Sequence, residues 1–268
     1  MVSTGDGVRT GAALMHRQRV LVTGSTSGIG AAIAEAFADE GAHVLVHGLD
    51  RSAGEALAQR LGGSFVEGDL ADPVAVERLG AGVSASGPLR VLVNNAGVER
   101  QSTIADLDFD VLAWTMQVNF TAPTRLTQLL LPSLRAARDA CVINVTSIHE
   151  EVPVYGNLAY CASKAALGMM TRTAALELGR EGIRVNAIAP GAVATQHNAA
   201  LLERIGPSLF EEWVPLRRVG TPTDIAGIAV FLASAAARYI NGHTVVADGG
   251  YRHHLVRYPG GESSGALP

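Results

Sequence analysis

The sequence of 268 residues predicts an α/β fold, a single domain built around a doubly wound parallel sheet of about seven strands. Two observations predict this fold. Short apolar runs alternate along the chain with helical patterns, which is the order that right-handed βαβ crossovers produce. The runs are apolar throughout rather than at every second residue, as expected for strands that are buried on both faces. No repeat, linker or break in composition divides the chain, so we expect one domain.

The first half of the chain is expected to form four strands with helices between them. Helical patterns occupy residues 28–40 and 52–61, and a third helix begins at Pro73, a residue that is tolerated in the first helical turn. The four strands are expected at 19–23, 42–47, 64–67 and 89–93.

The second half is expected to add three strands and longer helices. A helical stretch at 107–137 should be interrupted at Pro123 and Pro132, because proline lacks the N–H that an inner helical turn donates. Later helices are expected at 158–179 and, after an irregular segment, at 223–234. The three strands are expected at 141–145, 183–188 and 244–247.

The composition excludes several classes of function. The net charge is −4 and only 5% of the residues are aromatic, so neither a basic surface nor a stacking platform indicates nucleic-acid binding. No apolar run is long enough for a membrane span or a signal peptide. The two cysteines, Cys141 and Cys161, form neither a disulfide framework nor a metal-ligand pattern, so we expect no metal and a reducing, cytoplasmic setting.

The two ends of the chain differ in composition from the rest. Residues 1–17 are rich in Gly, Ser and Thr, and are expected to form a flexible N-terminal extension before a folded domain at 18–268. The last residues, 260–268, are expected to be a flexible tail.

Tyr160 and Lys164 are the strongest chemical signal in the sequence. They lie four residues apart on a predicted helix, so both side chains emerge on one face, and Ser147 lies thirteen residues before Tyr160. An ammonium group beside a phenol favours the phenolate and is expected to lower the tyrosine pKa. Alone, this spacing is also common in ordinary amphipathic helices, so its meaning depends on the rest of the chain.

A glycine-rich loop lies between the first predicted strand and the first predicted helix. Glycines let backbone amides approach a pyrophosphate, and the N-terminus of the following helix favours a negative charge. The alternative is a turn that only reverses the chain, but the strand–loop–helix context favours dinucleotide binding. The candidate residues in this loop are Gly24, Ser25, Ser27, Gly28, Ile29 and Gly30.

Three further loops follow predicted strands, at the sheet edge where open α/β proteins bind ligands. The residues of each loop alone could serve only to form a turn, but together the loops are expected to line one crevice. Their candidate cofactor-binding residues are Asp69 and Leu70, then Asn95, Ala96 and Gly97, and finally Pro190, Gly191, Val193 and Thr195.

These motifs, in this order, resemble the short-chain dehydrogenase/reductase family over roughly residues 19–250. The resemblance implies a Rossmann fold and an oxidoreductase that uses a nicotinamide dinucleotide. It implies that Tyr160 is the general acid and base, that Lys164 lowers the tyrosine pKa and binds the nicotinamide ribose, and that Ser147 binds the reacting oxygen. Asn119 matches the asparagine that positions a water next to the lysine. A helix-kink role for Asn119 is equally open.

The coenzyme preference is expected to be decided after the second strand. Relatives that prefer NAD often have an acid there, and those that prefer NADP have an arginine or lysine nearby. This sequence has Gly48 and Leu49 at these positions, followed by Asp50 and Arg51. Asp50 could bind the ribose 2′-hydroxyl and Arg51 could bind a 2′-phosphate, so NAD is expected, with NADP possible.

Within the family, three local stretches resemble the bacterial glucose 1-dehydrogenases. The resemblance implies that Glu99, His149 and Asn198, together with Ser147 and Tyr160, surround a sugar or polyol. Solvated loop charges and loop packing are the alternative roles for Glu99 and His149. The basic segment at 252–257 departs from the glucose enzymes and leaves an acidic sugar or hydroxy acid open.

Two other functions fit the same motifs. A reductase of 3-oxoacyl thioesters or ketones would have an apolar cleft and prefer reduced NADP. A non-catalytic nucleotide-binding regulator would usually lack Ser147, Tyr160 or Lys164, and all three are present. The resemblance also implies a homotetramer, in which the segment from Tyr251 onward reaches a neighbouring subunit.

Overall fold

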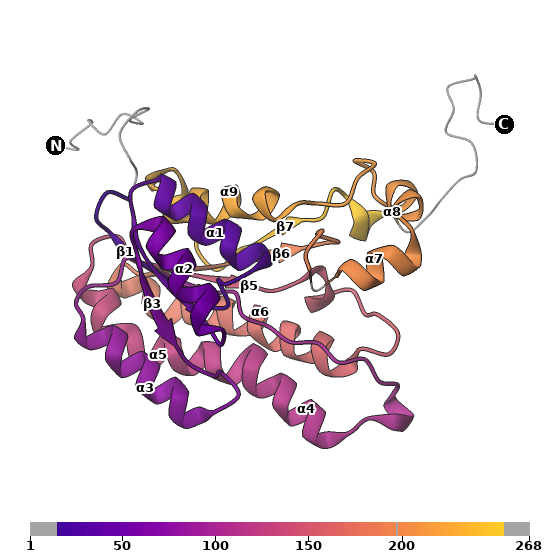
Figure 1. Cartoon of the computed structure of the whole chain (residues 1–268), viewed down its shortest axis with the longest axis horizontal. Helices are drawn as coiled ribbons and strands as arrows, with labels where there is room; N and C mark the ends of the chain where they lie inside the picture. Colours follow the sequence, from indigo (N-terminus) through magenta and orange to yellow (C-terminus); the bar gives the residue numbers. More distant parts are fainter. Residues whose placement is uncertain (1–14, 197, 255–268) are drawn as a thin grey trace.

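A seven-stranded, entirely parallel sheet forms the centre of the molecule (Figure 1). The computed structural model describes residues 15–196 and 198–254. The strand order is β3-β2-β1-β4-β5-β6-β7, which confirms the predicted doubly wound α/β fold. The strands are β1 Arg19–Val22, β2 His43–Gly48, β3 Ser64–Glu67, β4 Val91–Asn94, β5 Cys141–Val145, β6 Arg184–Pro190 and β7 Thr244–Ala247.

Helices cover both faces of the sheet (Figure 1). One face carries α1, α2 and α9, and the other carries α3, α4, α5 and α6. Among the described residues, none of the helices has the length and apolarity needed to cross a membrane. The bounds are α1 Gly28–Asp39, α2 Arg51–Leu61, α3 Pro73–Ala85, α4 Phe109–Met116, α5 Ala122–Ala136, α6 Leu158–Leu178 and α9 Pro222–Ala233.

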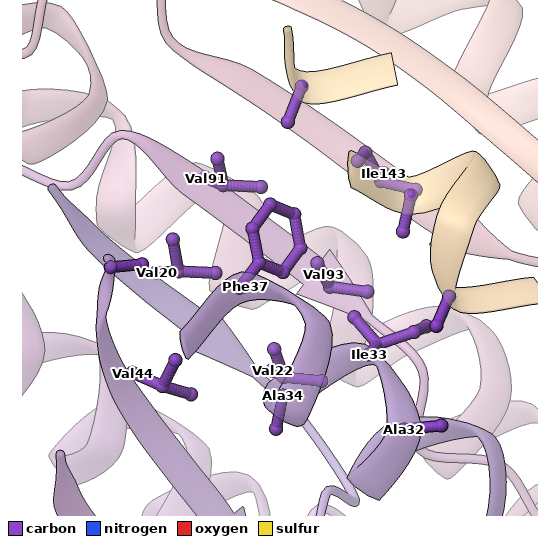
Figure 2. Packing of buried hydrophobic residues seen from close by; sticks show 14 of the residues in the cluster. Val20, Val22, Ala32, Ile33, Ala34, Phe37, Val44, Val91, Val93 and Ile143 are labelled. Carbon is purple, nitrogen blue, oxygen red and sulfur yellow. The ribbon is translucent and has the colours of Figure 1, made fainter. Parts of the chain in front are cut away.

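The alanine-rich helix α1 packs closely on the sheet because its small residues let the backbone approach the strands. Phe37 is the exception in size, and it is fully buried on the strand valines around Val20 and Val91 (Figure 2). Burying such a side chain stabilises the fold by about 1.5–3 kcal/mol. This packing fixes the last turns of α1 over the start of β1, and Ile33, nearer the glycine-rich loop, is fully buried in the same cluster.

The helical stretch from Phe109 to Ala136 is continuous, so the predicted interruptions at Pro123 and Pro132 are wrong. Pro123 lies in the first turn of α5, where a missing N–H costs little. Pro132 lies inside α5 on its exposed side, where water can hydrate the carbonyl that lacks a donor. The irregularity is instead a π turn at Gln117–Thr121, between α4 and α5.

Two short helices, α7 Ala199–Ile205 and α8 Pro207–Trp213, lie in the segment that the sequence predicted to be irregular. Each has seven residues, too few for a clear helical period. Phe210 is buried and meets Trp213 edge-to-face, with 5.6 Å between the ring centroids. Both residues belong to α8, and the burial of Phe210 fixes this short helix to the rest of the domain.

The folded domain includes residues that the sequence assigned to the N-terminal extension. Met15 is 1% exposed and belongs to the hydrophobic core, and its N–H donates to the carbonyl of Glu40. Arg17 donates its backbone N–H to Gly41. The expectation of a flexible extension is therefore wrong for residues 15–17, because Met15 fills a place in the core. Residues 1–14 and the tail at 260–268 lie outside the described residues.

Candidate active site

One cleft of about 1120 Å³ opens at the carboxyl ends of the strands. It lies where the strand order reverses between β1 and β4, the position at which doubly wound sheets bind ligands. The structure brings all but one of the predicted cofactor-binding residues to this cleft. Those that line it are Gly24, Ser27, Gly28, Ile29, Gly30, Asp50, Asp69, Leu70, Asn95, Ala96, Gly97, Tyr160, Lys164, Pro190, Gly191, Val193 and Thr195.

The glycine-rich loop is packed too closely to accept side chains. A Cβ at Gly24, where φ is +61°, would lie 2.9 Å from the Cα of Ala96. A Cβ at Gly30 would lie 2.3 Å from the carbonyl oxygen of Gly24. These close approaches leave a cradle of backbone rather than side chains along this wall of the cleft.

The N-terminus of α1 faces this cradle with its first N–H groups available. Ser27 makes no side-chain cap bond there, and the first turn holds no acidic residue. In contrast, α2, α3 and α4 are capped by the carboxylates of Asp50, Asp72 and Asp108. An uncapped helix N-terminus beside a glycine cradle fits the pyrophosphate of a dinucleotide.

Ser25 is the predicted cofactor-binding residue that does not line the cleft. It is fully buried beneath the loop, and its hydroxyl donates to the carbonyl of Val22 at 2.8 Å. The same hydroxyl accepts the backbone N–H of His47 at 2.9 Å. Its role is therefore to hold the loop against β1 and β2, and the prediction of direct cofactor contact is corrected.

The charged side chains that follow β2 have partners within the protein. The carboxylate of Asp50 accepts the N–H of Ala53 at 3.0 Å and so caps α2. Arg51 forms ion pairs with Glu55, at 3.2 Å, and with Glu67. Gly48 is in close contact with Thr26, since a Cβ there would lie 2.5 Å from Cγ2 of Thr26. Asp50 lines the cleft beside this glycine.

Lys164 lies deep in the cleft at 3% exposure. Its Nζ donates to the carbonyl of Val145 at 2.9 Å and lies 5.6 Å from the centroid of the Tyr160 ring. Burial lowers the pKa of Lys164 to about 8, against the opposing charges of Glu150 and Glu99. The ammonium group is thus partly stabilised by these two carboxylates.

Burial outweighs the neighbouring side chains in setting the pKa of Tyr160, which corrects the expectation for the tyrosine–lysine pair. Burial raises the pKa of Tyr160 to about 12, a hydrogen bond with Ser147 opposes this shift, and the charge of Glu99 adds to it. The Lys164 ammonium donates to the Val145 carbonyl and does not offset the burial of the phenol. In the protein alone Tyr160 is therefore a proton donor at neutral pH.

Asn119 is fully buried in the π turn and does not line the cleft. Its Nδ2 donates to the carbonyl of Val98 and to Ser163 Oγ, while its Oδ1 accepts the N–H of Val98, all at 2.8–3.0 Å. A Cβ at Gly97 would lie 3.3 Å from Lys164 Nζ and 3.5 Å from Asn119 Oδ1. Asn119 thus fixes the strand-end loop beside the lysine and acts as a positioning residue.

The predicted substrate residues all line the cleft: Glu99, Ser147, His149, Tyr160 and Asn198. His149 is paired through Nδ1 with the carbonyl of Val152 at 2.9 Å, and its ring meets that of Tyr160 edge-on at 6.3 Å. The side-chain amide of Asn198 donates to the carbonyl of Val193 at 3.1 Å, so part of its hydrogen-bonding capacity is used by the local backbone.

Asn157 is a site residue that sequence reasoning missed. It is 3% exposed, lines the cleft and donates its Nδ2 to the Glu99 carboxylate. It also connects the two segments, because Ser102 and Asn157 form an isolated parallel bridge. Its position three residues before Tyr160 was the only sequence signal for a role in the site. Its contact with Glu99 could not be predicted, because the two residues lie 58 positions apart in the sequence.

The segment after β7 also contributes to the cleft of its own chain. Tyr251 lines the cleft, and His254 is paired through Nδ1 with the carbonyl of Trp213 at 3.0 Å. Arg252 donates to Glu151 at 2.7 Å. The described part of the segment, residues 251–254, thus contacts its own chain, and its predicted reach to a neighbouring subunit stays a prediction. The rest of the basic segment, 255–257, lies outside the described residues.

Comparison with known proteins places this site in a family. A family model described as "Enoyl-(Acyl carrier protein) reductase" matches residues 24–252. The chain belongs to the short-chain dehydrogenase/reductase family. A solved gluconate 5-dehydrogenase from Burkholderia cenocepacia, in complex with NADP and tartrate, has a TM-score of 0.85 at 29% identity and covers 90% of this chain and 97% of its own.

Curated members of the family include dehydrogenases and a reductase. The galactitol 2-dehydrogenase (L-tagatose-forming) of Cereibacter sphaeroides is 35% identical over 86% of this chain and 93% of its own length. The glucose 1-dehydrogenase of Gluconobacter oxydans is 36% identical over 87% and 91%. The 3-oxoacyl-(acyl-carrier-protein) reductase of Chlamydia pneumoniae is 32% identical over 87% and 96%. The protein is an NAD(P)-dependent oxidoreductase that acts on alcohol or carbonyl groups.

Proposed function

We propose that this short-chain dehydrogenase oxidises a secondary alcohol of a polyol or sugar. The observation that carries the proposal is the Glu99 carboxylate, which lines the cleft and is held there by Asn157. Its charge acts on both Tyr160 and Lys164, so it lies close to the catalytic pair. A carboxylate at that place would accept hydroxyl groups next to the reacting carbon. The names of several relatives support this substrate class.

The side chains of the cleft have separate roles in this reaction. Tyr160 exchanges a proton with the substrate oxygen, and Ser147 holds that oxygen by a hydrogen bond. Lys164 places its charge behind the tyrosine and is oriented by the Val145 carbonyl. A bound nicotinamide ring supplies the hydride acceptor or donor. His149 and Asn198, which also line the cleft, are proposed to bind further hydroxyl groups.

We infer that NAD is preferred over NADP. Asp50 lines the cleft with a carboxylate, which would repel a 2′-phosphate. Arg51, the cation nearest in sequence, is paired with Glu55 and Glu67 and is therefore neutralised. Steady-state kinetics with both coenzymes test this inference, and a kcat/KM for NADP more than about tenfold above that for NAD would contradict it.

A second candidate substrate is a 3-oxoacyl thioester or a ketone. Apolar side chains of the two short helices and their surroundings line one side of the cleft, namely Leu202, Ile205, Phe210 and Trp213. Such a wall suits an acyl chain, and a 3-oxoacyl reductase is among the relatives. This candidate predicts faster turnover with reduced NADP and an acetoacetyl thioester than with any polyol.

The assembly and location of the protein are also proposals. We propose a homotetramer, which the family resemblance suggests and which the apolar side chains exposed on α6, Met169 and Leu176, support. We propose the cytoplasm because both cysteines, Cys141 and Cys161, are free thiols.

A single screen separates the two substrate classes. Purified protein is mixed with aldoses, polyols, aldonates and hydroxy acids and with NAD or NADP, and the absorbance of the reduced coenzyme is followed. The reverse reaction is followed with ketoses, simple ketones and an acetoacetyl thioester. A polyol or sugar should give the highest kcat/KM. A thioester that exceeds every polyhydroxy compound would reject the proposed class.

A further inference from the structure

His47 is a buried polar residue beneath the coenzyme end of the cleft, and no part of the reaction described above uses it. It lies near the end of β2, is 2% exposed and belongs to the lining of the cleft. Its backbone is bonded twice to Ser25, through His47 N–H to Oγ at 2.9 Å and through Ser25 N–H to the His47 carbonyl at 2.8 Å. These bonds fix the residue beside the glycine-rich loop.

The imidazole ring bonds to the first glycine of this loop. The Nδ1 atom of His47 accepts the N–H of Gly24 at 3.1 Å. Gly24 has a positive φ and packs against Ala96, so its backbone has little room to shift. A nitrogen that accepts an N–H carries no proton itself, which assigns the proton of the neutral ring to Nε2.

The other ring nitrogen faces a second wall of the cleft. Nε2 is buried without a partner at hydrogen-bonding geometry, and a Cβ at Gly68 would lie 3.5 Å from it. Gly68 and Asp69 follow β3 and line the cleft, and β2, which carries His47, lies between β3 and β1 in the sheet. The ring therefore lies between two cleft walls that come from different parts of the chain.

We propose that His47 is a positioning residue of the coenzyme site, whose neutral imidazole holds the phosphate-binding loop at Gly24 in register with the Gly68–Asp69 wall. A leucine or phenylalanine at this place would fill the volume but leave the buried N–H of Gly24 without an acceptor. The loop would then satisfy that N–H by moving, and its backbone amides would no longer point at the pyrophosphate. The inference rests on NAD(P) binding in this cleft and does not depend on the substrate class.

Three substitutions separate the two contacts of the ring. Asparagine places its Oδ1 close to the position of Nδ1, so His47→Asn keeps the acceptor for Gly24 and loses the contact with Gly68. Glutamine reaches the position of Nε2, so His47→Gln keeps the Gly68 side and loses the acceptor. His47→Leu loses both. His43→Asn is the matched control, because His43 lies on the same strand but bonds Ser64 at 3.0 Å, away from the cleft.

The dissociation constants of NAD and of its reduced form are measured by calorimetry and by coenzyme fluorescence, without substrate. We expect His47→Leu and His47→Gln to raise them about tenfold, and His47→Asn and His43→Asn to stay within about twofold of the wild type. At saturating coenzyme kcat should be unchanged in all four. In the wild type, nitrogen NMR of the ring should show an unprotonated Nδ1.

Wild-type affinity in His47→Leu, or a proton on Nδ1, would overturn the proposal. If His47→Leu does not fold, the comparison of His47→Asn with His47→Gln decides, and equal dissociation constants in these two variants reject the role. Because substrate is absent from the binding measurement, an error in the proposed substrate class leaves this test unaffected.

Discussion

At the scale of single residues, two buried ionisable side chains, Tyr160 and Lys164, define the site. Tyr160 must carry a proton to reduce a carbonyl and must lose it to oxidise an alcohol. Burial holds its pKa at about 12, while burial of Lys164 lowers the lysine pKa to about 8. Both shifts have the same cause, the cost of placing a charge in the interior, and both favour the uncharged forms.

This assignment predicts different pH dependences for the two directions of the reaction. Below its pKa, the phenolate fraction of Tyr160 rises tenfold with each pH unit, so kcat/KM for alcohol oxidation should increase between about pH 6 and pH 9. Carbonyl reduction, which uses the protonated tyrosine, should stay level or fall over the same range. Initial rates in both directions on one substrate pair test this. The same dependence in both directions would contradict Tyr160 as the proton-transfer group.

Glu99 is predicted to recognise hydroxyl groups other than the one that reacts. Glu99→Ala should raise KM for a polyol by about tenfold or more, because the hydroxyl that the carboxylate bound is left unpaired. KM for a small alcohol, which has no second hydroxyl, should change little. Glu151→Ala is the control, since Glu151 carries the same charge nearby but bonds Arg252 at the surface. Equal effects of Glu99→Ala on both substrates would rule out the sugar-binding role.

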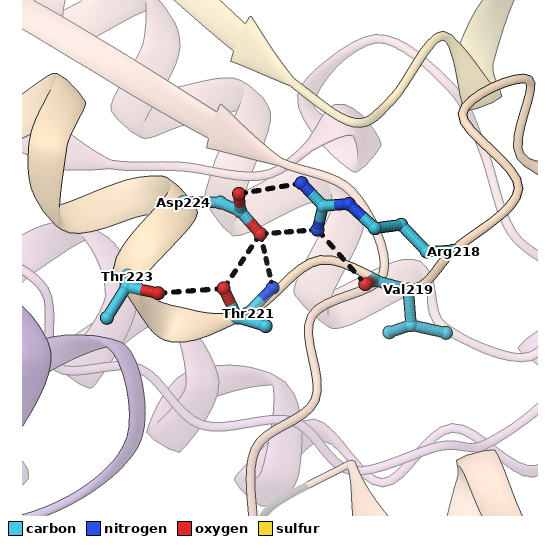
Figure 3. Close-up of polar contacts among 5 residues, drawn as sticks. All are labelled: Arg218, Val219, Thr221, Thr223 and Asp224. Carbon is cyan, nitrogen blue, oxygen red and sulfur yellow. Dashed lines mark hydrogen bonds and ion pairs between the residues drawn. The ribbon is translucent and has the colours of Figure 1, made fainter.

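At the scale of elements, one capping motif connects a helix to the coenzyme cleft. Asp224, in the first turn of α9, accepts the N–H and hydroxyl of Thr221 and both terminal nitrogens of Arg218 (Figure 3). The neighbouring Gly220 pairs in both directions with the segment from Ala192 to Ala194, which follows β6 in the cleft. The motif thus fixes a loop that supports the predicted nicotinamide side.

Asp224→Ala should lower the free energy of unfolding by about 1 kcal/mol, the usual worth of a helix cap, with little added by the exposed ion pair. The Arg218 guanidinium and the Thr221 donors hold the pKa of Asp224 well below its usual range. This contribution is therefore present above the unfolded-state pKa, near pH 4, and is lost as pH falls further.

Urea unfolding of the wild type and Asp224→Ala at neutral and at acid pH measures this effect. Glu211→Ala is the matched control, because Glu211 is an exposed carboxylate within the short helix α8. The difference between wild type and Asp224→Ala should shrink in acid. A difference that stays constant, or one that Glu211→Ala reproduces, would contradict the capping role.

The elements also show which parts of the structure are local enough to be predicted. The glycine-rich loop and the spacing of Tyr160 and Lys164 depend on neighbours in sequence, and both lie where the sequence placed them. Asn157 and His47 act through contacts with segments distant in the chain, which a single sequence does not show. The helices α7 and α8 are too short for a periodic pattern. Met15 ends a short apolar run, 12–15, in a segment rich in Gly, Ser and Thr, and only its burial identifies it as core.

At the scale of the whole molecule, the apolar face of α6 is predicted to bury itself between subunits. Met169 and Leu176 lie seven residues apart on one face of this helix and are 56% and 79% exposed. Leu176→Glu should place a charge in that contact and convert the proposed tetramer to smaller species in analytical ultracentrifugation. Glu177→Lys is the control for a charge change beside that position. An unchanged sedimentation coefficient for Leu176→Glu would exclude α6 as a subunit contact.

The cleft depends on the whole molecule, because the strand order of the sheet creates it and helix termini line it. Tyr160 is the residue that reacts in it. The most direct test of this account is the substitution Tyr160→Phe, which removes one oxygen and leaves the ring in place. With the best substrate of the screen, oxidation monitored by coenzyme absorbance should fall by about a thousandfold or more, while the dissociation constant for NAD stays within about twofold of the wild type. Turnover retained near the wild-type rate would contradict the assignment of this cleft as the active site.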